Sequence, residues 1–376
     1  MKSVASLLEE GLAAGAYPSA ELSVLHHGLQ VFHHTVGEVP EGADFDLASL
    51  TKILATTTAF ISLWAQGRLF PETPLAQFFP ESPAGKRGVT LEDLLTHRSG
   101  LPTWKPFFTD TLARHPELLT APTAPSRTLA REGVIAAAAA VELEAAPRTR
   151  AAYSDVGFIL LGEVLAREAG APLDDVVEAH VMRHLELPLH FHRLSRVDEA
   201  HRALSVPTGA TRPREPAPGQ EQVLGELLSV PARPGEVDDD NAWVMDGVAG
   251  HAGLFGRAPA IANLGELVLE ELRGARKLAP PGHWQRLLTR DATTPGSTRA
   301  LGFDTPSASG SSTGASFPPS AFGHLGFTGT SLWVDPTRSL VVAFCSNRTL
   351  PGRQNNLLRE FRPRLHDAVV RALRLT

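Results

Sequence analysis

Apolar residues near the start of the chain follow first a helical and then an alternating spacing. Four of them between positions 4 and 12 recur at helical spacing, which predicts an amphipathic helix over residues 3–15. Alternating segments at 20–26 and 29–35 flank His27-Gly28 and predict a β-hairpin. The apolar run over residues 53–64 predicts a buried helix. We expect the first helix to cover one face of a sheet.

Helical patterns fill the middle of the chain. Thr90 and Asp93 form a variant of the capping box, which predicts that a short helix begins there. The alanine-rich segment 131–146 has the composition of a helix, and apolar residues after Tyr153 predict another helix that ends near residue 169. Residues 207–240 are rich in Pro and Gly, so we expect a long irregular loop there.

The end of the chain returns to a strand pattern. Residues 339–346 are mostly apolar and follow a turn at 335–338, which predicts a hairpin strand. The segment 357–373 predicts a terminal helix that packs beside the amino-terminal one. Strand patterns near both ends, with helices between them, are typical of a sheet that both ends share.

The composition is that of an ordinary globular protein. Of the 376 residues, 43% are hydrophobic and 20% are charged, enough for a large core in two domains or in one domain with a big insertion. The net charge of −6 is spread without long runs of one sign. We therefore expect neither a nucleic-acid nor a membrane partner, and the oligomeric state stays open.

Cysteine usage and the amino terminus bear on location. The single cysteine, Cys345, lies in an apolar run, so no intrachain disulfide can form. Residues 1–10 lack the uninterrupted apolar segment of a secretory signal, and nowhere do about 18 apolar residues run together. We expect a cytoplasmic protein.

Ser49-x-x-Lys52 is the first candidate for chemistry. In a helix these two side chains share a face, so an amine comes within reach of a hydroxyl. A serine becomes a good nucleophile when a neighbouring base takes its proton, and a lysine with a lowered pKa can be that base. The alternative is a helix-capping serine followed by a solvent-facing lysine.

Two later segments add candidate groups. Tyr153 directly precedes a helix, which would hold its phenol rigidly at a cleft; the alternative is an amphipathic tyrosine at a domain interface. Gly326, in the segment that begins at His324, would let a substrate approach the backbone closely.

Histidine clusters raise a metal hypothesis. His180 and His184 share a helical face, with His190 and His192 further along the chain, but no glutamate follows His180 directly. The four histidines at positions 26–34 lack an accompanying carboxylate pattern. We therefore predict no metal ion and no cofactor.

Three short motifs, taken in chain order, resemble those of the serine β-lactamase and penicillin-binding-protein superfamily. They are Ser49-x-x-Lys52, Tyr153-Ser154-Asp155 and His324-Leu325-Gly326. The resemblance is closest to the class C β-lactamase branch, with its esterases and D-alanyl-D-alanine peptidases. It implies an α/β (α+β) fold, an antiparallel sheet flanked by helices plus an inserted, mostly helical domain. The site would lie between the two domains.

The domain boundaries follow from combining this fold with the hydrophobic pattern. We expect residues 1–67 and 241–376 to form the discontinuous α/β domain. Residues 68–240 would form the inserted helical domain, with the Pro- and Gly-rich loop at its end.

The resemblance also implies a role for each matching residue. Ser49 would be the acylated nucleophile, and Lys52 and Tyr153 the proton-transfer pair. His324 is the counterpart of the basic residue in the third motif. The backbone N–H groups of Ser49 and Phe327 would form an oxyanion hole.

Three positions, in two of the motifs, depart from the family pattern. Asp155 replaces an asparagine, so its carboxylate would pair with Lys52, keep the ammonium charged and favour Tyr153 as the base. The pKa of Tyr153 is then expected to be lowered by that charge. His324 and Leu325 replace lysine and threonine, which removes a fixed cation and a hydroxyl that would hold a β-lactam carboxylate.

The predicted function is that of a cytoplasmic serine hydrolase that cleaves an ester or amide bond through an acyl-Ser49 intermediate. Its substrate would be a small molecule or a short peptide. The alternatives are a D-amino-acid peptidase or amidase acting on cell-wall fragments, and a weak class C-type β-lactamase. A non-catalytic binding protein is a further alternative, against which the intact Ser49, Lys52 and Tyr153 argue.

Overall fold

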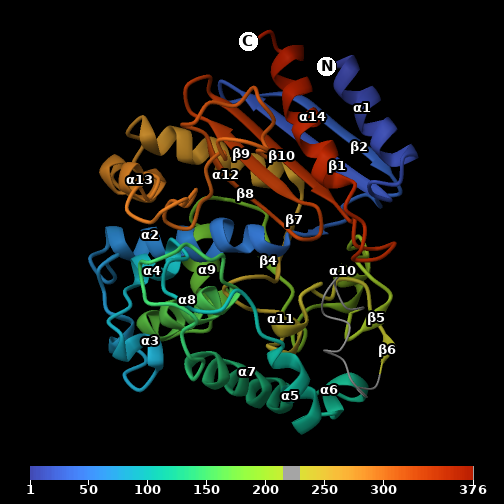
Figure 1. Cartoon of the computed structure of the whole chain (residues 1–376). Helices are drawn as coiled ribbons and strands as arrows, with labels where there is room; N and C mark the ends of the chain where they lie inside the picture. The colour runs from blue at the N-terminus through green and yellow to red at the C-terminus, as the bar shows by residue number, and fades with distance from the viewer. Residues whose placement is uncertain (215–228, 376) are drawn as a thin grey trace.

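The computed structural model describes residues 1–214 and 229–375, so the predicted loop 207–240 falls partly outside the described residues. Within these ranges a five-stranded antiparallel sheet lies beside a mostly helical region (Figure 1). The predicted fold class, an antiparallel sheet flanked by helices with further helices in the middle of the chain, is confirmed. The expected domain boundaries after residues 67 and 240 stay a prediction.

The large sheet joins strands from both ends of the chain in the order β2-β1-β10-β9-β8. Its strands are β1 (Ser19–His26), β2 (Leu29–Gly37), β8 (Phe322–Leu325), β9 (Ser331–Asp335) and β10 (Leu340–Ser346). The predicted hairpin is β1 with β2, and β1 also pairs with β10 along its whole length except its first residue. The two ends of the chain therefore share one sheet, as the strand patterns indicated.

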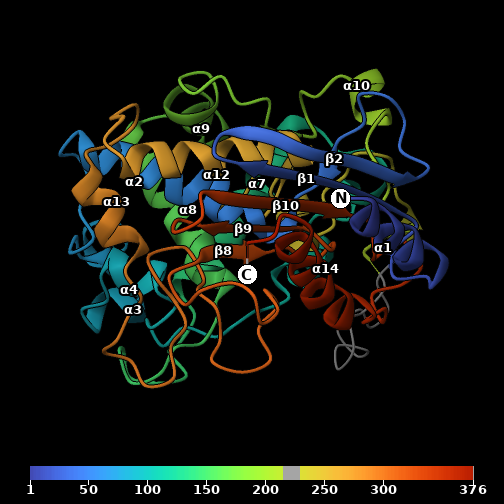
Figure 2. The same cartoon turned by 90° about the horizontal axis from the view of Figure 1, so that it is seen from above.

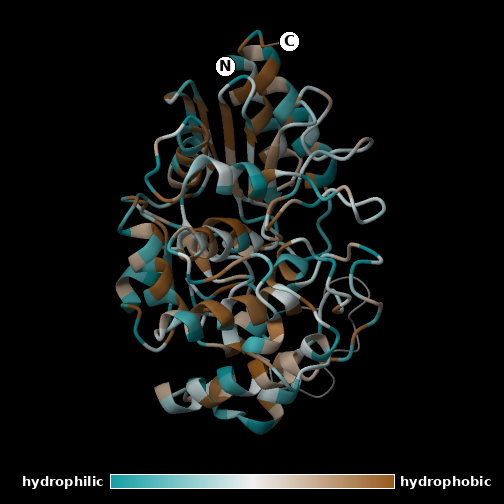
Figure 3. Ribbon diagram, turned by 90° about the vertical axis from the view of Figure 1, so that its left-hand side faces the viewer, coloured by the Kyte–Doolittle hydropathy of each residue, from teal (hydrophilic) through white to brown (hydrophobic). Residues whose placement is uncertain are grey.

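Helices cover both faces of this sheet (Figure 2). α12 (Ala258–Leu272) packs on one face, where a Cβ on Gly265 would lie 2.6 Å from the Val341 side chain, so the helix approaches closely. α1 (Lys2–Ala13) and α14 (Leu358–Ala372) lie side by side on the other face, as predicted. Hydrophobic residues concentrate in the strands and central helices (Figure 3), and β1, β9 and β10 are buried on both sides, whereas the edge strand β2 is largely exposed.

The segment that carries Ser49 differs from the single helix expected. The short strand β3 (Phe45–Asp46) leads into a 3₁₀ turn, η1 (Ala48–Leu50), then a π-helical segment, η2 (Lys52–Thr57), and then α2 (Thr58–Ala65). The Thr58 hydroxyl donates to the Ile53 carbonyl at 2.7 Å, a contact that suits a widened turn. Every residue from Ile53 to Trp64 is buried, which explains why this run is mostly apolar.

Two predicted helices illustrate how local sequence sets an element. α4 (Leu91–Leu95) begins at the predicted capping box, where the side chains of Thr90 and Asp93 bond to each other's backbone N–H. α8 (Asp155–Ala169) begins after Ser154 and ends at Gly170, which has a left-handed conformation.

The helix predicted at 131–146 is shifted. α7 runs over Ala124–Ala139, because Thr123 and Ser126 form a capping box at its start. Beyond residue 140 the chain leaves the helix, and the amides of Glu144 and Arg148 donate to the carbonyls of Gly100 and Arg98. This tertiary pairing overrides the helical composition of the segment.

The remaining elements are short. They are η3 (Leu75–Gln77), α3 (Pro83–Lys86), α5 (Phe107–Arg114), α6 (Glu117–Thr120), α9 (Leu173–Val177), η4 (Glu178–Met182), β4 (His190–Phe191), α10 (Glu199–Ala203), β5 (Thr211–Arg212), β6 (Val230–Pro231), α11 (Asp240–Val244), β7 (Leu254–Gly256) and α13 (Pro281–Leu288). β3, β7 and β4 form a second sheet, and β5 pairs with β6. Among the described helices, none combines the length and hydrophobicity needed to span a bilayer.

Candidate active site

A cleft of about 810 Å³ lies where the large sheet meets the helical region. Six of the seven residues predicted for the site line it, and the seventh, Lys52, is buried beside Ser49. The six are Ser49, Tyr153, Asp155, His324, Gly326 and Phe327. The structure therefore brings together every residue predicted from the three motifs.

The backbone that presents Ser49 is held in an unusual conformation. Ala48 has a φ of 46°, which is uncommon for a residue with a side chain. The Asp46 carboxylate accepts a hydrogen bond from the Ala48 amide at 2.8 Å, and Thr330 donates its hydroxyl to the Leu47 carbonyl at 3.0 Å. These bonds fix the turn and aim Ser49 into the cleft.

Lys52 directs its amine at three oxygen atoms. Nζ lies 2.9 Å from Ser49 Oγ, 3.1 Å from the His251 carbonyl oxygen and 2.7 Å from Asp155 Oδ1. The contacts with Ser49 and His251 are hydrogen bonds, and the contact with Asp155 is an ion pair. Burial alone would lower the pKa of Lys52, but Asp155 and Tyr153 outweigh it and the pKa is raised. Lys52 is therefore held as a cation, as expected from Asp155.

Tyr153 lies against the same amine. Its ring centroid is 4.8 Å from Lys52 Nζ, and its buried hydroxyl has no hydrogen-bond partner among the described residues. The expectation of a lowered pKa is wrong in its net direction. Burial raises the pKa of the Tyr153 phenol, and this outweighs the opposing effect of the Lys52 charge.

The start of α8 positions both neighbours of Ser154. The Ser154 hydroxyl accepts from the Gly157 amide at 3.1 Å and donates to the Pro102 carbonyl at 2.6 Å. Its amide donates to Nδ1 of the buried His97 at 2.9 Å. Ser154 therefore anchors the turn that presents Tyr153 and Asp155 to the cleft.

The expected oxyanion donors are available. Neither the Ser49 amide nor the Phe327 amide donates a hydrogen bond to any residue in the described part of the chain. Gly326 brings β8 close to the Ser49 turn, since a Cβ there would lie 1.9 Å from Thr330 Oγ1 and 2.7 Å from the Leu47 carbonyl. Glycine is thus required by packing, in addition to the substrate approach expected from the sequence.

His324 does not replace the charge of the family's third-motif lysine. Its Nδ1 donates to the Leu325 carbonyl at 2.7 Å, which leaves the buried Nε2 as a bare acceptor. Burial lowers its pKa well below the ordinary value, and the charges of Arg299 and Lys52 lower it further. The imidazole is therefore neutral at pH 7.

Comparisons with known proteins agree with this geometry. The profile of the Beta-lactamase family matches residues 4–363. The chain belongs to the β-lactamase family. The resemblance found in its three motifs is thereby confirmed, and the protein is a serine hydrolase of that family.

Relatives of this β-lactamase-family protein include hydrolases of amide bonds. It is 27% identical to an N-acetylmuramyl-L-alanine amidase of Bacillus subtilis (strain 168), over 93% of this chain and 81% of the relative. It is 28% identical to a candidate D-alanyl-D-alanine carboxypeptidase of Escherichia coli (strain K12), over 82% of this chain and 69% of that relative. An octameric penicillin-binding protein homologue from Pyrococcus abyssi shares the fold, with a TM-score of 0.69 and 18% identity over 99% of this chain and 77% of that one.

Three groups of the site were not predicted. Arg299 lies over the Tyr153 ring at 5.1 Å and pairs with Asp304 at 3.4 Å, so the β-lactamase-family protein has a cation here after all. The Nδ1 atom of His97 accepts a hydrogen bond from the Ser154 amide. The backbone carbonyl of His251 accepts one from Lys52. The sequence around Arg299 carries no motif, and a contact made by a backbone carbonyl leaves no pattern in side-chain types.

Proposed function

We propose that this β-lactamase-family protein cleaves amide or ester bonds through a covalent acyl intermediate on Ser49. The observation that carries this proposal is the 2.9 Å contact between Ser49 Oγ and Lys52 Nζ in the cleft, with Tyr153 beside both. A nucleophile next to proton-transfer groups and two free amide donors is what acyl transfer requires.

The reaction can be followed group by group. Ser49 Oγ attacks the carbonyl carbon and its proton passes to the Tyr153–Lys52 pair, while the amides of Ser49 and Phe327 stabilise the oxyanion. The tetrahedral intermediate then expels the amine or alcohol, which takes a proton from the same pair. Water attacks the acyl-Ser49 ester with the same groups as base, and this step regenerates the hydroxyl.

Tyr153 is the better candidate for the base. Asp155 holds Lys52 as an ammonium, and an ammonium has no lone pair with which to accept the proton of Ser49. A Tyr153 phenolate would lie beside the Lys52 ammonium, which stabilises it once the proton has left. Lys52 then acts mainly through its charge.

Arg299 supports a substrate with a free carboxylate on the leaving side. A leaving amine must approach its proton donor, Tyr153, and in a leaving amino acid the carboxylate is one carbon away from that amine. Arg299 lies over the Tyr153 ring and lines the same cleft. Peptides with a free carboxyl end fit this geometry, and the names of the amidase and carboxypeptidase relatives support cell-wall fragments that end in a D-amino acid.

Phe327 offers a contact for the acyl side. Its side chain is 41% exposed, and Arg348 and Arg353 lie against its ring at 4.6 and 5.4 Å. This surface would hold a peptide group with polar or acidic substituents next to the oxyanion donors. The cytoplasmic location expected from the sequence stays a prediction, which fractionation of cells tests.

Turnover of β-lactams should be poor. The neutral His324 and the apolar Leu325 offer neither the ammonium nor the hydroxyl of the family's third motif, so the binding of a β-lactam carboxylate would depend on Arg299. We expect a chromogenic cephalosporin to be cleaved slowly, and the double variant His324→Lys with Leu325→Thr to improve its cleavage. Rapid cleavage by the parent protein would contradict this account of the third motif.

The test of the main proposal is Ser49→Ala. Hydrolysis of a p-nitrophenyl short-chain ester and release of D-alanine from an N-acylated D-alanyl-D-alanine peptide should both fall about a thousandfold or more. Ser6→Ala, on the exposed side of α1, is the matched control and should keep full activity. Retention of more than about a tenth of the activity in Ser49→Ala would assign the chemistry elsewhere.

The substrate class is tested by Arg299→Gln. KM for the D-alanyl-D-alanine peptide should rise about ten- to a hundredfold, the range expected when a charged hydrogen bond is lost. The peptide with an amidated carboxyl end, and the neutral ester, should be unaffected. An equal loss on all three substrates would show that Arg299 supports the site structurally instead of binding a carboxylate.

A further inference from the structure

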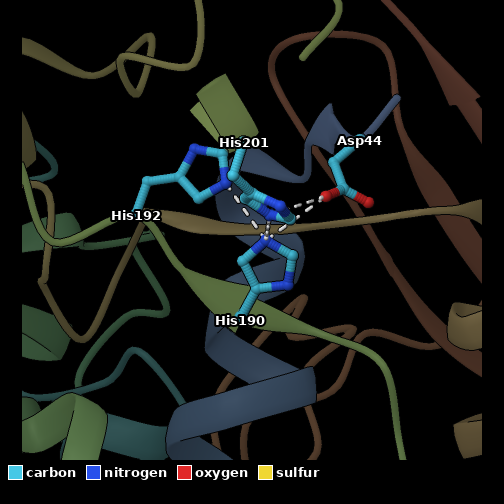
Figure 4. A group of neighbouring side chains, drawn as sticks. All are labelled: Asp44, His190, His192 and His201. Atoms are coloured by element: carbon cyan, nitrogen blue, oxygen red, sulfur yellow. Dashed lines mark hydrogen bonds and ion pairs between the residues drawn. The ribbon is translucent and has the colours of Figure 1, made fainter. Parts of the chain in front are cut away.

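A second cluster of chemically capable side chains lies outside the cleft (Figure 4). It combines Asp44, which precedes β3, with His190 of β4, His192 directly after β4, and His201 of α10. One ligand-type atom of each residue lies within 4.8 Å of the others. We call these four residues the histidine cluster.

Four of the six distances within the histidine cluster are close to those between ligands of one metal ion, and the other two are at most 4.8 Å. His190 Nε2 lies 3.1 Å from His192 Nε2, 3.0 Å from His201 Nε2 and 3.2 Å from Asp44 Oδ2. His201 Nε2 is 3.8 Å from the same carboxylate oxygen. Tetrahedral zinc with bonds of about 2.0–2.1 Å separates neighbouring ligand atoms by about 3.3 Å.

The protonation pattern favours a cation over hydrogen bonds alone. His192 Nδ1 lies 2.9 Å from the Gly235 carbonyl oxygen, so it carries the hydrogen and Nε2 presents a lone pair to the cluster. This is the outer hydrogen bond that orients metal-binding histidines in general. The His192 ring also stacks on Phe255 at 3.9 Å, which fixes its plane. A hydrogen on His190 Nε2 could serve only one of its three close neighbours well.

We propose that Asp44, His190, His192 and His201 bind one divalent transition-metal ion of the zinc type. Three imidazole nitrogens and one carboxylate oxygen are a ligand set that zinc accepts. His190 and His201 are partly exposed, with 34% and 48% of their side-chain surface accessible, so an ion can enter from solvent.

The ion has a structural role. Four protein ligands complete a tetrahedral shell and leave no open position for a substrate. In the second sheet, His190 and Asp46 pair with the same residue of β7, Phe255, from its two sides. A shared ion therefore ties the outer strands β3 and β4 to each other and to α10, and β3 leads directly to Ser49. Metal binding should stabilise the fold near the nucleophile.

The histidine cluster could not be predicted from the sequence because its residues come from distant segments of the chain. From the sequence, His180 and His184 are candidate ligands but no metal ion is predicted; neither residue belongs to the cluster, and His184 contacts the Lys277 carbonyl. The carboxylate comes from Asp44, 146 positions before His190 in the numbering, and His201 comes from a separate helix. The pairing of β3 and β4 with β7 brings Asp44 near His190 and His192, and α10 adds His201.

The test uses untagged, chelator-treated protein titrated with Zn²⁺ and, separately, with Co²⁺. We expect one equivalent of each to bind, and Co²⁺ to show the intense visible absorption of a four-coordinate site. At a hundredfold excess over Kd, Zn²⁺ should raise Tm by about 3 °C or more. Absence of stoichiometric binding, or a Co²⁺ spectrum of a six-coordinate ion, would overturn the proposal.

Variants assign the binding to the cluster. His201→Ala changes a partly exposed residue, so the protein should fold, and its Zn²⁺ affinity should fall about a hundredfold or more. His190→Ala should behave in the same way. His184→Ala removes an exposed histidine outside the cluster and should leave both the affinity and the Tm shift unchanged. Unchanged binding in His201→Ala and His190→Ala would place the ion elsewhere.

Discussion

At the scale of single residues, Asp155 decides how the site holds its protons. Its carboxylate contacts Lys52 Nζ at 2.7 Å and helps to raise the pKa of that amine against the effect of burial. The pKa of Tyr153 is raised as well, chiefly by burial. At neutral pH both groups are therefore protonated. One proton must leave this coupled pair before Ser49 can be activated.

The first prediction is that kcat/KM rises with pH above neutrality and that Asp155→Asn moves this rise to lower pH. The substitution removes the negative charge that holds protons on both Lys52 and Tyr153. The measurement is the pH profile of kcat/KM with a neutral ester. Asp174→Asn, whose carboxylate pairs with Arg193 in the parent, is the control and should leave the profile in place.

Tyr153→Phe completes this test. We expect a loss of about a hundredfold or more in kcat/KM, in the range of lost general-base catalysis. If the profile does not move in Asp155→Asn and Tyr153→Phe is nearly as active as the parent, Lys52 alone would be the base.

At the scale of elements, the start of α8 contributes both to the stability of the fold and to the geometry of the cleft. Ser154 caps the helix, and the residues on either side of it, Tyr153 and Asp155, face the cleft. The cap of α7, Thr123, makes the same kind of bond, to the Ser126 amide at 3.2 Å, and it does not line the cleft. The two caps therefore form a matched pair.

The second prediction compares Ser154→Ala with Thr123→Ala. Thr123→Ala should lower the free energy of unfolding by about 1 kcal/mol, as for other lost helix caps, and Ser154→Ala, which also loses the buried bond to the Pro102 carbonyl, by about 2 kcal/mol. Only Ser154→Ala should also lower kcat, by about tenfold, because the turn that presents Tyr153 and Asp155 is released. Denaturant unfolding and steady-state kinetics measure the two effects. Equal kinetics in both variants would limit Ser154 to a purely structural role.

Elements with strong local patterns could be predicted from the sequence. The hairpin of β1 and β2 and the capping box of α4 follow from alternation and from short-range hydrogen bonds. The bounds of α7 could not be predicted, since residues 141–148 hydrogen-bond to a distant loop instead. The three motifs pointed to residues that the structure brings together at the cleft, whereas Arg299 reaches the site from a segment without regular structure. Long-range packing decides such positions.

At the scale of the whole molecule, buried titratable groups link stability to pH. His366 of α14 is fully buried, and its Nδ1 lies 2.9 Å from the Ser312 carbonyl oxygen. Burial lowers its pKa to about 4, although the hydrogen bond to that carbonyl acts to raise the pKa. Between pH 6.5 and 4 the unfolded chain binds a proton that the folded protein does not, so His366 lowers the stability as pH falls. The buried Asp46, whose pKa is raised to about 7 by burial and by Asp238, acts in the opposite direction.

The third prediction isolates His366 from Asp46 by comparing parent and variant. Between pH 7 and pH 5, His366 should lower the free energy of unfolding of the parent by about 2 kcal/mol. This contribution should be absent from His366→Gln. Denaturant unfolding at the two pH values measures the difference. His184→Gln, at an exposed histidine, should keep the parent's pH dependence. An identical dependence in parent and His366→Gln would contradict the assignment.

The central claim is that Ser49 becomes covalently acylated, and trapping it with a fluorophosphonate tests this most directly. Intact-protein mass spectrometry should show a single adduct, and peptide mapping should place it on Ser49. The adduct should be absent from Ser49→Ala and present in the control Ser6→Ala. An adduct on another residue, or an unmodified Ser49 in protein whose ester hydrolysis the reagent has abolished, would contradict the account.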